Sequence, residues 1–179
     1  MLEKGFVQIY TGNGKGKTTA ALGLALRTAG HGGKVLIYQF LKPLTLDLGE
    51  RISIEKIPGV TLQVLDEPWD MKKSFDDDAA MEKVRSAIRK SLLVLAKEAA
   101  ERYYDVMILD EIVFCINKGL AEFKDIRNLI DKKDPEVEIV MTGRGAGDEL
   151  IAMADLVTEM KAVKHPFEQN IGARKGIEF

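Results

Sequence analysis

The sequence predicts an α/β fold in which helices cover both faces of a mostly parallel, six-stranded sheet, the doubly wound arrangement. Apolar strand patterns alternate with helical patterns along most of the 179 residues, as in chains of parallel crossover units. The strand pattern at residues 106–109 is apolar throughout, which indicates that both of its faces are buried. A glycine-rich turn at residues 11–16 joins the first strand pattern to a helical one, at the sheet edge where such folds bind ligands.

The first half of the chain contains three expected strands and two expected helices. The apolar run at 6–10 is the first strand, and the Ala- and Leu-rich segment 17–29 is the helix that follows it. The second and third strands, 34–40 and 60–65, each follow a pair of turn residues that includes glycine. In the helix expected at 77–102, apolar residues recur at steps of three and four, and aspartates at its start suit a helix cap.

The second half repeats the alternation in shorter elements. After the buried strand at 106–109 come two short helical patterns, a fifth strand, another helical pattern and a sixth strand. These elements are expected at residues 112–117, 123–132, 138–142, 148–153 and 156–160. The segment 41–59 and the tail from residue 161 onward show no such pattern, and we expect them to be irregular loops near the site.

Length and composition suit a single domain spanning residues 1–179, in which the tail from about residue 161 forms active-site or interface elements. The net charge of −2 provides no bulk attraction for nucleic acid or for an anionic membrane, and no stretch is apolar enough to span a bilayer. The single cysteine, Cys115, lies in an apolar run and is expected to be buried and unreactive. Because no signal-peptide pattern is present either, we expect a reducing, cytoplasmic location.

The segment Thr-Gly-Asn-Gly-Lys-Gly-Lys-Thr-Thr at 11–19 is the strongest functional signal in the chain. The backbone N–H groups of such a turn converge on one point, and the following helix adds its unpaired N–H groups and positive dipole end. This pattern predicts a triphosphate site, as in P-loop nucleotide-binding folds, and we call residues 11–19 the cradle. Lys17 would act as a point charge and the Thr18 hydroxyl as a Mg²⁺ ligand. The leading glycine position of the usual pattern holds Thr11. The expected nucleotide-binding residues are Thr11, Gly12, Asn13, Gly14, Lys15, Gly16, Lys17, Thr18 and Thr19.

Two further polar segments leave the same edge of the predicted sheet. Asp110 and Glu111 end the buried fourth strand, where one carboxylate can hold Mg²⁺ through water while the other binds it directly or acts as a base. Arg144 follows the fifth strand and could neutralise phosphate oxygens with its fork geometry. The alternative for Arg144 is a solvated turn residue.

Other polar positions have weaker signals. Residues 39–42 and 49–51 could reach a ribose, a base or a metal, but their residue types alone predict exposed loops. Trp69 lies in a polar loop that contains proline, and a packing anchor is favoured there over a stacking surface for a large flat ligand. His31 and His165 lack an obvious partner for zinc or nucleophilic chemistry, so we interpret them as structural.

Several short motifs follow one another in a specific order and spacing along the chain. Besides the segment 11–19, they are Gln39-Phe-Leu-Lys42, Gly49-Glu50-Arg51, Leu109-Asp-Glu111, Thr142-Gly-Arg144, Ala154-Asp155, Lys164-His-Pro-Phe167 and Gly176-Ile-Glu-Phe179. In this order they resemble the P-loop type of ATP:corrinoid adenosyltransferase, a family of cobalamin synthesis and salvage. The resemblance covers nearly the whole chain, and the C-terminal pair of motifs is its most distinctive part.

The resemblance implies a six-stranded P-loop fold, usually a homodimer, and an unusual reaction. One-valent cobalt of a reduced corrinoid such as cob(I)alamin attacks C5′ of ATP, and inorganic triphosphate leaves. The family is described as binding ATP in the reverse sense to most P-loop enzymes, and Thr11 in the leading glycine position fits such an atypical cradle. A reductant must supply the one-valent cobalt, and a flavoprotein is the candidate.

The resemblance also assigns roles to residues. It implies that Lys17, Glu111 and Arg144 are catalytic, and that Lys17 acts on the leaving triphosphate together with the backbone N–H groups of the turn. It further implies a Mg²⁺ or Mn²⁺ ion held by Thr18 and Glu111, with Asp110 close by. Much of the rate is then expected from holding the two substrates in line.

Corrinoid binding is implied for Trp69, Phe75 and Glu50, and here the chain departs from the family. A phenylalanine usually lies two residues before the tryptophan, but this position holds Glu67. The role of that phenylalanine toward the corrinoid therefore moves to Phe75 or another side chain. Arg174 replaces a glutamine of the tail. The N-terminal helix that covers the partner's site in some members is expected to be missing, because the first strand begins almost at once.

Two other functions are compatible with the same residues. A phosphoryl-transfer NTPase or small-molecule kinase would use the same cradle, metal and Arg144, but would release ADP instead of triphosphate. A binding module without turnover would hold ATP or a corrinoid and form no adenosylated product. The motifs beyond the glycine-rich turn favour the adenosyltransferase.

Overall fold

The computed structural model describes residues 2–70 and 74–179, and in these ranges the strands form one parallel sheet. They lie in the order β3-β2-β4-β5-β1-β6, and each neighbouring pair is parallel. Their bounds are Val7–Thr11 (β1), Val35–Gln39 (β2), Val60–Val64 (β3), Val106–Asp110 (β4), Glu138–Thr142 (β5) and Leu156–Glu159 (β6). The expected six-stranded α/β fold is confirmed.

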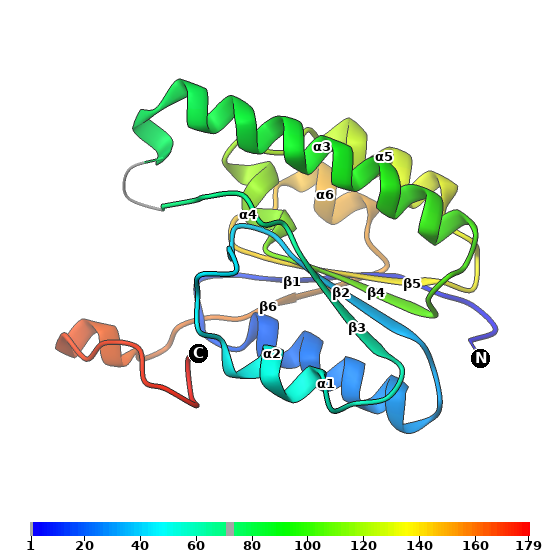
Figure 1. The fold of residues 1–179 in the computed structure, drawn as a ribbon, viewed down its shortest axis with the longest axis horizontal. Helices are drawn as coiled ribbons and strands as arrows, with labels where there is room; N and C mark the ends of the chain where they lie inside the picture. Colours follow the sequence, from blue (N-terminus) through cyan, green and yellow to red (C-terminus); the bar gives the residue numbers. More distant parts are fainter. Residues whose placement is uncertain (1, 71–73) are drawn as a thin grey trace.

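Helices cover both faces of this sheet (Figure 1). On one face lie α1 (Lys17–Gly30) and α2 (Gly49–Ile54). The opposite face is covered by α3 (Asp78–Ala100), α4 (Ile112–Asn117), α5 (Phe123–Lys132) and α6 (Asp148–Met153). Short 3-10 turns are formed by Ser74–Asp76 and Pro166–Gln169. Within residues 2–70 and 74–179, no helix has the length and apolar character needed to cross a membrane.

Most elements begin and end within two residues of their expected bounds, but α2 does not follow expectation. Residues 41–59 are expected to be irregular, and this is wrong at 49–54. The helix is only six residues long and has no side-chain cap, so neither periodicity nor capping reveals it. The start of α3 follows the prediction, since the Asp77 carboxylate accepts hydrogen bonds from the N–H groups of Ala79 and Ala80 at 3.0 and 3.1 Å.

Burial follows the position of each strand in the sheet. All residues of β2, β4 and β5 are buried, whereas every residue of the edge strand β6 is exposed. The continuous apolar strands therefore occupy the centre of the doubly wound sheet.

Cys115 on α4 is fully buried, as expected, and burial raises the pKa of its thiol well above the usual value.

The strand order brings the expected functional loops together. Strand β5 lies between β4 and β1, so Thr142 at the end of β5 is paired in register with Tyr10, next to the glycine-rich turn. On the other side of β5, β4 ends at Asp110. Three loops at one edge of the sheet, which begin near residues 11, 110 and 142, therefore surround a common point.

Candidate nucleotide and corrinoid site

The glycine-rich turn packs directly against the backbone that follows β6. The Gly14 N–H donates a 2.6 Å hydrogen bond to the carbonyl of Met160. A Cβ atom on Gly12 or Gly14 would lie only 2.5 or 2.6 Å from that carbonyl oxygen, and Gly12 has a φ of +92°. Glycine is required at both positions because two backbone segments meet there. The tail that follows β6 therefore forms one wall of the cradle.

Lys17, the first residue of α1, folds back over this turn. Its Nζ donates hydrogen bonds of 2.8 and 2.7 Å to two carbonyl groups of the turn, and the residue is 8% exposed. Burial lowers the pKa of Lys17, and the charge of Arg144 lowers it further, whereas Glu111 and Asp110 raise it. The structure thus brings Lys17 together with the three charged residues expected to act with it.

Asp110 connects the cradle to the neighbouring loops. Its Oδ1 accepts hydrogen bonds from the hydroxyls of Thr18 at 2.8 Å and Thr142 at 2.7 Å. Its Oδ2 lies 2.5 Å from the ammonium nitrogen of Lys42, and the Asp110 side chain is 1% exposed. The Thr142 hydroxyl also accepts the backbone N–H of Glu111 at 3.0 Å. A buried carboxylate with these partners fixes the relative positions of α1, β4 and β5.

Glu111 follows Asp110 in a left-handed conformation, with φ of +68°, at the start of α4. Such backbone strain in a residue other than glycine is concentrated at functional sites. Burial raises the pKa of Glu111, and the charge of Asp110 raises it further, while Lys42 and nearby cations oppose the shift. Glu111 is therefore held in a partly dry site beside several positive charges.

The donor atoms here fit a divalent cation that arrives with a nucleotide. In the described part of the chain, no three or more His, Cys, Asp or Glu side chains are grouped as a complete metal site. However, Mg²⁺ is usually bound by one or two carboxylates together with substrate phosphates. The Thr18 hydroxyl donates its proton to Asp110, so its lone pairs are available to a cation. Thr18 and Glu111 thus suit direct ligation, and Asp110 suits orientation of the hydroxyl.

The loop after β5 presents Arg144 to the same site. Gly143 has a φ of +139°, and a Cβ atom there would lie 2.5 Å from the backbone nitrogen of Phe114, so the loop lies directly on α4. The Thr11 hydroxyl accepts the N–H of Ala146 at 3.2 Å. The side chain of Thr11 therefore holds the loop of Arg144 in place, which gives a structural reason for threonine in the leading glycine position.

A clamp around Arg51 orders the segment that follows β2. The Arg51 guanidinium donates to Gln39 Oε1 at 2.9 Å, to the Lys42 carbonyl at 2.6 Å and to the Pro43 carbonyl at 3.2 Å. Gln39 is fully buried. The expectation of exposed loops at 39–42 and 49–51 is therefore wrong for Gln39, which is buried. Lys42 is only partly exposed, because its polar groups bond to other parts of the fold.

Two cavities open beside the cradle. One, of about 410 Å³, is lined by Thr18, Thr19, Leu22, Lys42, Leu48, Gly49, Glu50, Ser53 and the four C-terminal residues. The other, of about 280 Å³, is lined by Leu41, Lys42, Glu111, Phe114 and Arg144. Lys42 belongs to both linings. Lys42 therefore borders both the space beside Thr18 and the space beside Glu111 and Phe114.

An aromatic row lies behind the smaller cavity. The rings of Trp69 and Phe75 meet edge to face with centroids 5.0 Å apart, and the rings of Phe75 and Phe114 are 6.4 Å apart. Trp69, at the other end of the row from Phe114, also lines a further hollow of about 570 Å³. The two predicted aromatic residues are thus brought together and reach the site through Phe114. Glu67, in contrast, forms a 3.0 Å ion pair with Lys83 on α3.

Glu50 is placed apart from this aromatic row. Its carboxylate accepts a hydrogen bond from Gln39 Nε2 at 3.2 Å, and it lines the larger cavity next to α1. Trp69 and Phe75 do not line that cavity. The structure therefore groups Glu50 with Thr18 and Thr19 and does not bring it to the two aromatic residues.

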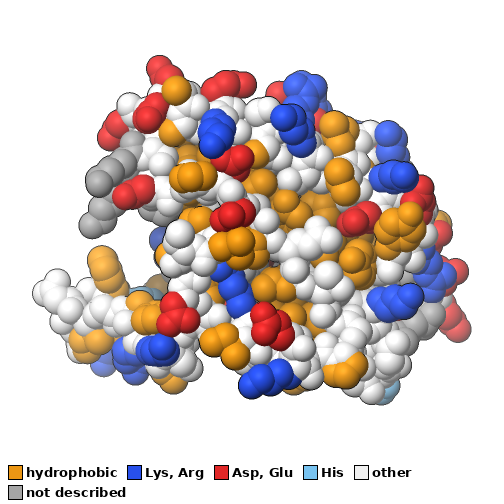
Figure 2. All heavy atoms as spheres, viewed as in Figure 1, with side chains coloured by type: hydrophobic (Ala, Val, Ile, Leu, Met, Phe, Trp, Pro, Cys, Tyr) orange, Lys and Arg blue, Asp and Glu red, His pale blue; other side chains and the backbone are white. Residues whose placement is uncertain are grey.

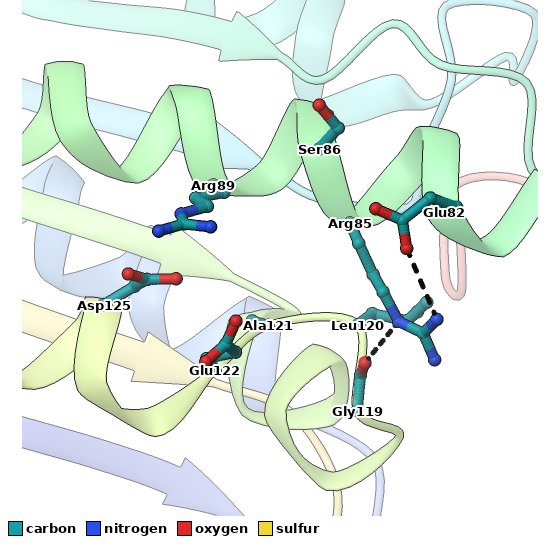
Figure 3. A pocket seen from close by; sticks show the side chains of 9 residues that line it. All are labelled: Glu82, Arg85, Ser86, Arg89, Gly119, Leu120, Ala121, Glu122 and Asp125. Atoms are coloured by element: carbon teal, nitrogen blue, oxygen red, sulfur yellow. Dashed lines mark hydrogen bonds and ion pairs between the residues drawn. The ribbon is translucent and has the colours of Figure 1, made fainter.

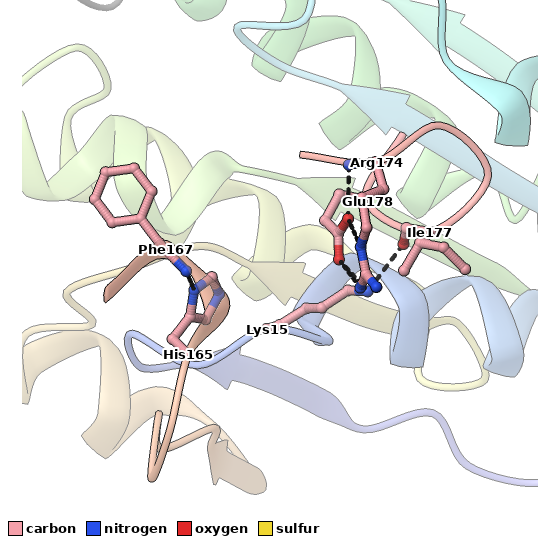
Figure 4. A network of polar contacts seen from close by, with 6 residues as sticks. All are labelled: Lys15, His165, Phe167, Arg174, Ile177 and Glu178. Atoms are coloured by element: carbon pink, nitrogen blue, oxygen red, sulfur yellow. Dashed lines mark hydrogen bonds and ion pairs between the residues drawn. The ribbon is translucent and has the colours of Figure 1, made fainter. Parts of the chain in front are cut away.

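The tail returns to the cradle at its C-terminal end (Figure 4). Lys15 donates hydrogen bonds to the Ile177 carbonyl at 2.9 Å and to Glu178 Oε1 at 3.0 Å. Glu178 is also held by the Arg174 guanidinium, and this hydrogen bonding lowers the pKa of Glu178 to about 2. In the space-filling view the tail projects beside an open notch in the molecule (Figure 2). One lysine of the predicted cradle is thus paired with the tail.

A separate polar hollow of about 190 Å³ lies between α3 and the start of α5 (Figure 3). Arg85 there donates to the Gly119 carbonyl at 2.8 Å and pairs with Glu82 at 3.7 Å. Its lining contains acidic and basic side chains. None of the predicted site residues belongs to this hollow.

Three residues of the site have no assigned role in the sequence-based predictions: Lys42, Thr142 and Phe114. Residues 39–42 are expected only to be able to reach a ligand. Lys42 and Thr142 lie within recognised motifs, and their positions just after or at the ends of strands were the available signal. Phe114 has no local signal, because only the packing of α4 brings it to the cavity.

Comparison with known proteins identifies relatives along the whole chain. A family model described as ATP:corrinoid adenosyltransferase BtuR/CobO/CobP matches residues 3–179. The corrinoid adenosyltransferase of Escherichia coli (strain K12) is 34% identical over 179 residues, which cover 99% of this chain and 87% of the relative. The corrinoid adenosyltransferase CobA of Salmonella typhimurium is 32% identical with the same coverage. That of Pseudomonas aeruginosa is 34% identical over 180 residues, covering 99% and 85%.

A solved structure with a similar fold is the KaiC-like protein PH0186 from Pyrococcus horikoshii OT3. It superimposes with a TM-score of 0.54 over 90% of this chain and 74% of its own, at 16% sequence identity. At this identity the likeness supports the α/β fold alone.

Proposed function

Because the chain belongs to the ATP:corrinoid adenosyltransferase family, we propose that its glycine-rich turn holds the triphosphate of ATP and that the corrinoid enters from the aromatic side. The enzyme transfers the adenosyl group of ATP to a corrinoid in cobalamin synthesis. The kinase, NTPase and binding-module alternatives are not favoured by its relatives.

The cavity formed by Glu111, Phe114 and Arg144 beside the cradle is the observation that supports this division of the site. Aromatic rings behind it supply a surface suited to a large flat ligand. The phosphate groups of ATP lie at Lys17 and Thr18 in this proposal, and C5′ points toward the aromatic cavity.

The reaction needs stabilisation of a leaving group rather than transfer of a phosphoryl group. Cobalt of the reduced corrinoid attacks C5′, and the electron pair of the C5′–O bond remains on the triphosphate. Lys17, Arg144 and the N–H groups of the turn stabilise that charge. Thr18 and Glu111 would hold a Mg²⁺ or Mn²⁺ ion, which supplies further charge neutralisation when bound. Asp110 orients the Thr18 hydroxyl.

Trp69 and Phe75 bind the corrinoid in this proposal. Glu67 occupies the position of the family phenylalanine and forms an ion pair with Lys83. Phe75 provides the aromatic ring that packs against Trp69 instead. The contact of Glu50 with Gln39, and its place in the cavity lined by Thr18 and Thr19, support a position near the proposed nucleotide. Its predicted corrinoid contact therefore stays a prediction without support from the cavity linings.

The assembly and setting of the enzyme are also part of the proposal. We infer a single-domain homodimer in the cytoplasm, served by a flavoprotein reductant. The chain length suits one domain and the single cysteine suits a reducing compartment, while the dimer and the reductant accompany the family that the sequence resembles. Exposed apolar side chains on β6 and the tail, among them Val157, Val163 and Phe167, suit a contact between copies. Sedimentation analysis tests the dimer, and a monomer at micromolar concentration would contradict it.

Separate binding measurements test the division of the site. Calorimetry with MgATP and absorbance titration with cobalamin are carried out on wild type, Lys17→Ala and Trp69→Ala. Lys17→Ala should weaken ATP binding and keep cobalamin binding, and Trp69→Ala should weaken cobalamin binding and keep ATP binding. Equal loss of both ligands in either variant would contradict two separate subsites.

A further inference from the structure

We propose that Lys42 is a catalytic residue whose ammonium group neutralises the charge that develops on the departing phosphate oxygen. This inference rests on the proposed placement of ATP. In the reaction, the C5′–O bond breaks as the carbon–cobalt bond forms. The electron pair of the broken bond stays on the α-phosphate oxygen, so the triphosphate leaves with one additional negative charge and no proton need be transferred.

Lys42 lies where the triphosphate and the adenosyl group of ATP must join in this placement. It lines the cavity that contains Thr18 and Thr19, and it also lines the cavity that contains Glu111 and Phe114. A nucleotide with its phosphates in the cradle and C5′ toward the aromatic side passes this lysine at the bond that breaks. A cation at that point stabilises the transition state more than the bound substrate, because the charge is not yet present on the substrate.

The backbone around Lys42 is built to hold it in place. The preceding residue, Leu41, has a left-handed φ of +55°, which is rare and strained for a residue other than glycine. The carbonyl of Lys42 accepts a 2.6 Å hydrogen bond from Arg51, which is itself bound to the buried Gln39 of β2. The strain is thus maintained by a clamp anchored in the core of the sheet.

The ion pair of Lys42 with Asp110 keeps the ammonium group at the site. The two charged atoms are 2.5 Å apart, and the Lys42 side chain is 19% exposed while that of Asp110 is 1% exposed. Asp110 retains two hydroxyl partners, Thr18 and Thr142, if the ammonium turns toward a phosphate. A purely structural role, in which Lys42 only neutralises Asp110, is the alternative that the experiment must separate.

The experiment compares inorganic triphosphate with ATP as ligands of Lys42→Met, since triphosphate carries the leaving-group charge and ATP does not. Calorimetry with Mg²⁺ and no corrinoid should show the triphosphate Kd raised on the order of 10-fold or more, with the ATP Kd changed less than about threefold. The rate of adenosylation at saturating ATP should fall on the order of 100-fold. Lys42→Arg should restore part of both losses, and Lys90→Met, which removes an exposed lysine of α3, should change neither.

Several outcomes would overturn the role of Lys42. Equal weakening of ATP and triphosphate would make Lys42 a residue of general binding, and an unchanged adenosylation rate would remove it from the reaction. If Lys42→Met does not fold, the comparison is made between Asp110→Asn and Lys42→Met/Asp110→Asn, in which no carboxylate is left unpaired. Failure of the wild-type enzyme to form an adenosylated corrinoid would instead contradict the proposed function.

Discussion

The hydroxyl of Thr18 donates a 2.8 Å hydrogen bond to Oδ1 of Asp110, and so joins the start of α1 to the end of β4. Because Thr142 of the intervening strand β5 donates to the same oxygen, three loops of the site share one buried acceptor. The residue that can hold a metal ion and the carboxylate that orients it are therefore preorganised by the sheet before any substrate binds.

Lys17→Ala should weaken MgATP binding on the order of 100-fold, because a charge-assisted phosphate contact is lost. The fold should persist, since the two hydrogen bonds of Lys17 go to carbonyl groups of an already constrained turn. Calorimetry with MgATP and circular dichroism measure the two effects. Lys90→Ala on α3 serves as the matched control, and near-wild-type ATP affinity in Lys17→Ala would contradict the assigned cradle.

Glu111→Gln should raise thermal stability at pH 7 and lower the adenosylation rate on the order of 100-fold. A carboxyl whose pKa is raised by folding stabilises the protein most when protonated. This stabilisation is complete below the ordinary carboxyl pKa of 4.5. It is lost as pH rises through the raised pKa of Glu111 in the folded protein. Gln cannot ionise, so the stability gain over wild type should shrink as pH falls toward 4.5. Melting curves from pH 4.5 to 8 check this, and a gain that grows with acidity would contradict it.

Trp69→Ala should spare ATP affinity and reduce kcat/KM for the reduced corrinoid on the order of 10-fold, because a large aromatic contact surface is removed. Trp69→Phe should keep most activity, since a ring can still meet Phe75. Steady-state kinetics with each substrate varied in turn separate the effects. If both substrates are affected alike, Trp69 is a packing residue instead.

Glu178→Gln should strengthen ATP binding by up to about fivefold, because Lys15 is freed from an exposed ion pair and can turn to phosphate. Lys175→Ala breaks another ion pair of the tail, with Asp47, and should leave ATP affinity unchanged. Fluorescence titration with a nucleotide analogue measures both variants. Weaker binding in Glu178→Gln would mean that the closed tail helps to hold ATP.

The fold was predictable because its signals are local and repeated. Buried strands such as β4 are apolar throughout, and the long helix α3 has both periodicity and an Asp cap. The helix α2 was not predictable, since six residues without a side-chain cap leave no pattern. Its structure depends on tertiary contacts, among them the clamp of Arg51 on the loop after β2.

The site was predictable where one segment contains its chemistry. Lys17 and Thr18 follow a glycine-rich turn, and Asp110 and Glu111 end an apolar strand, so residue type and position agree. Lys42 and Phe114 enter the site through the packing of different elements against one another. Their residue types are common in loops and helix faces. The place of Lys42 just after a strand was its one signal, and nothing in the sequence around Phe114 distinguishes it from a core residue.

The most direct measurement is the identity of the phosphorus-containing product. The enzyme is incubated with ATP, Mg²⁺ and chemically reduced cobalamin, and the products are followed by ³¹P NMR and by the absorbance of the corrinoid. Cleavage at C5′ predicts inorganic triphosphate in equal amount to adenosylated corrinoid, and no triphosphate without corrinoid. ADP and phosphate released at a rate independent of corrinoid would contradict the account.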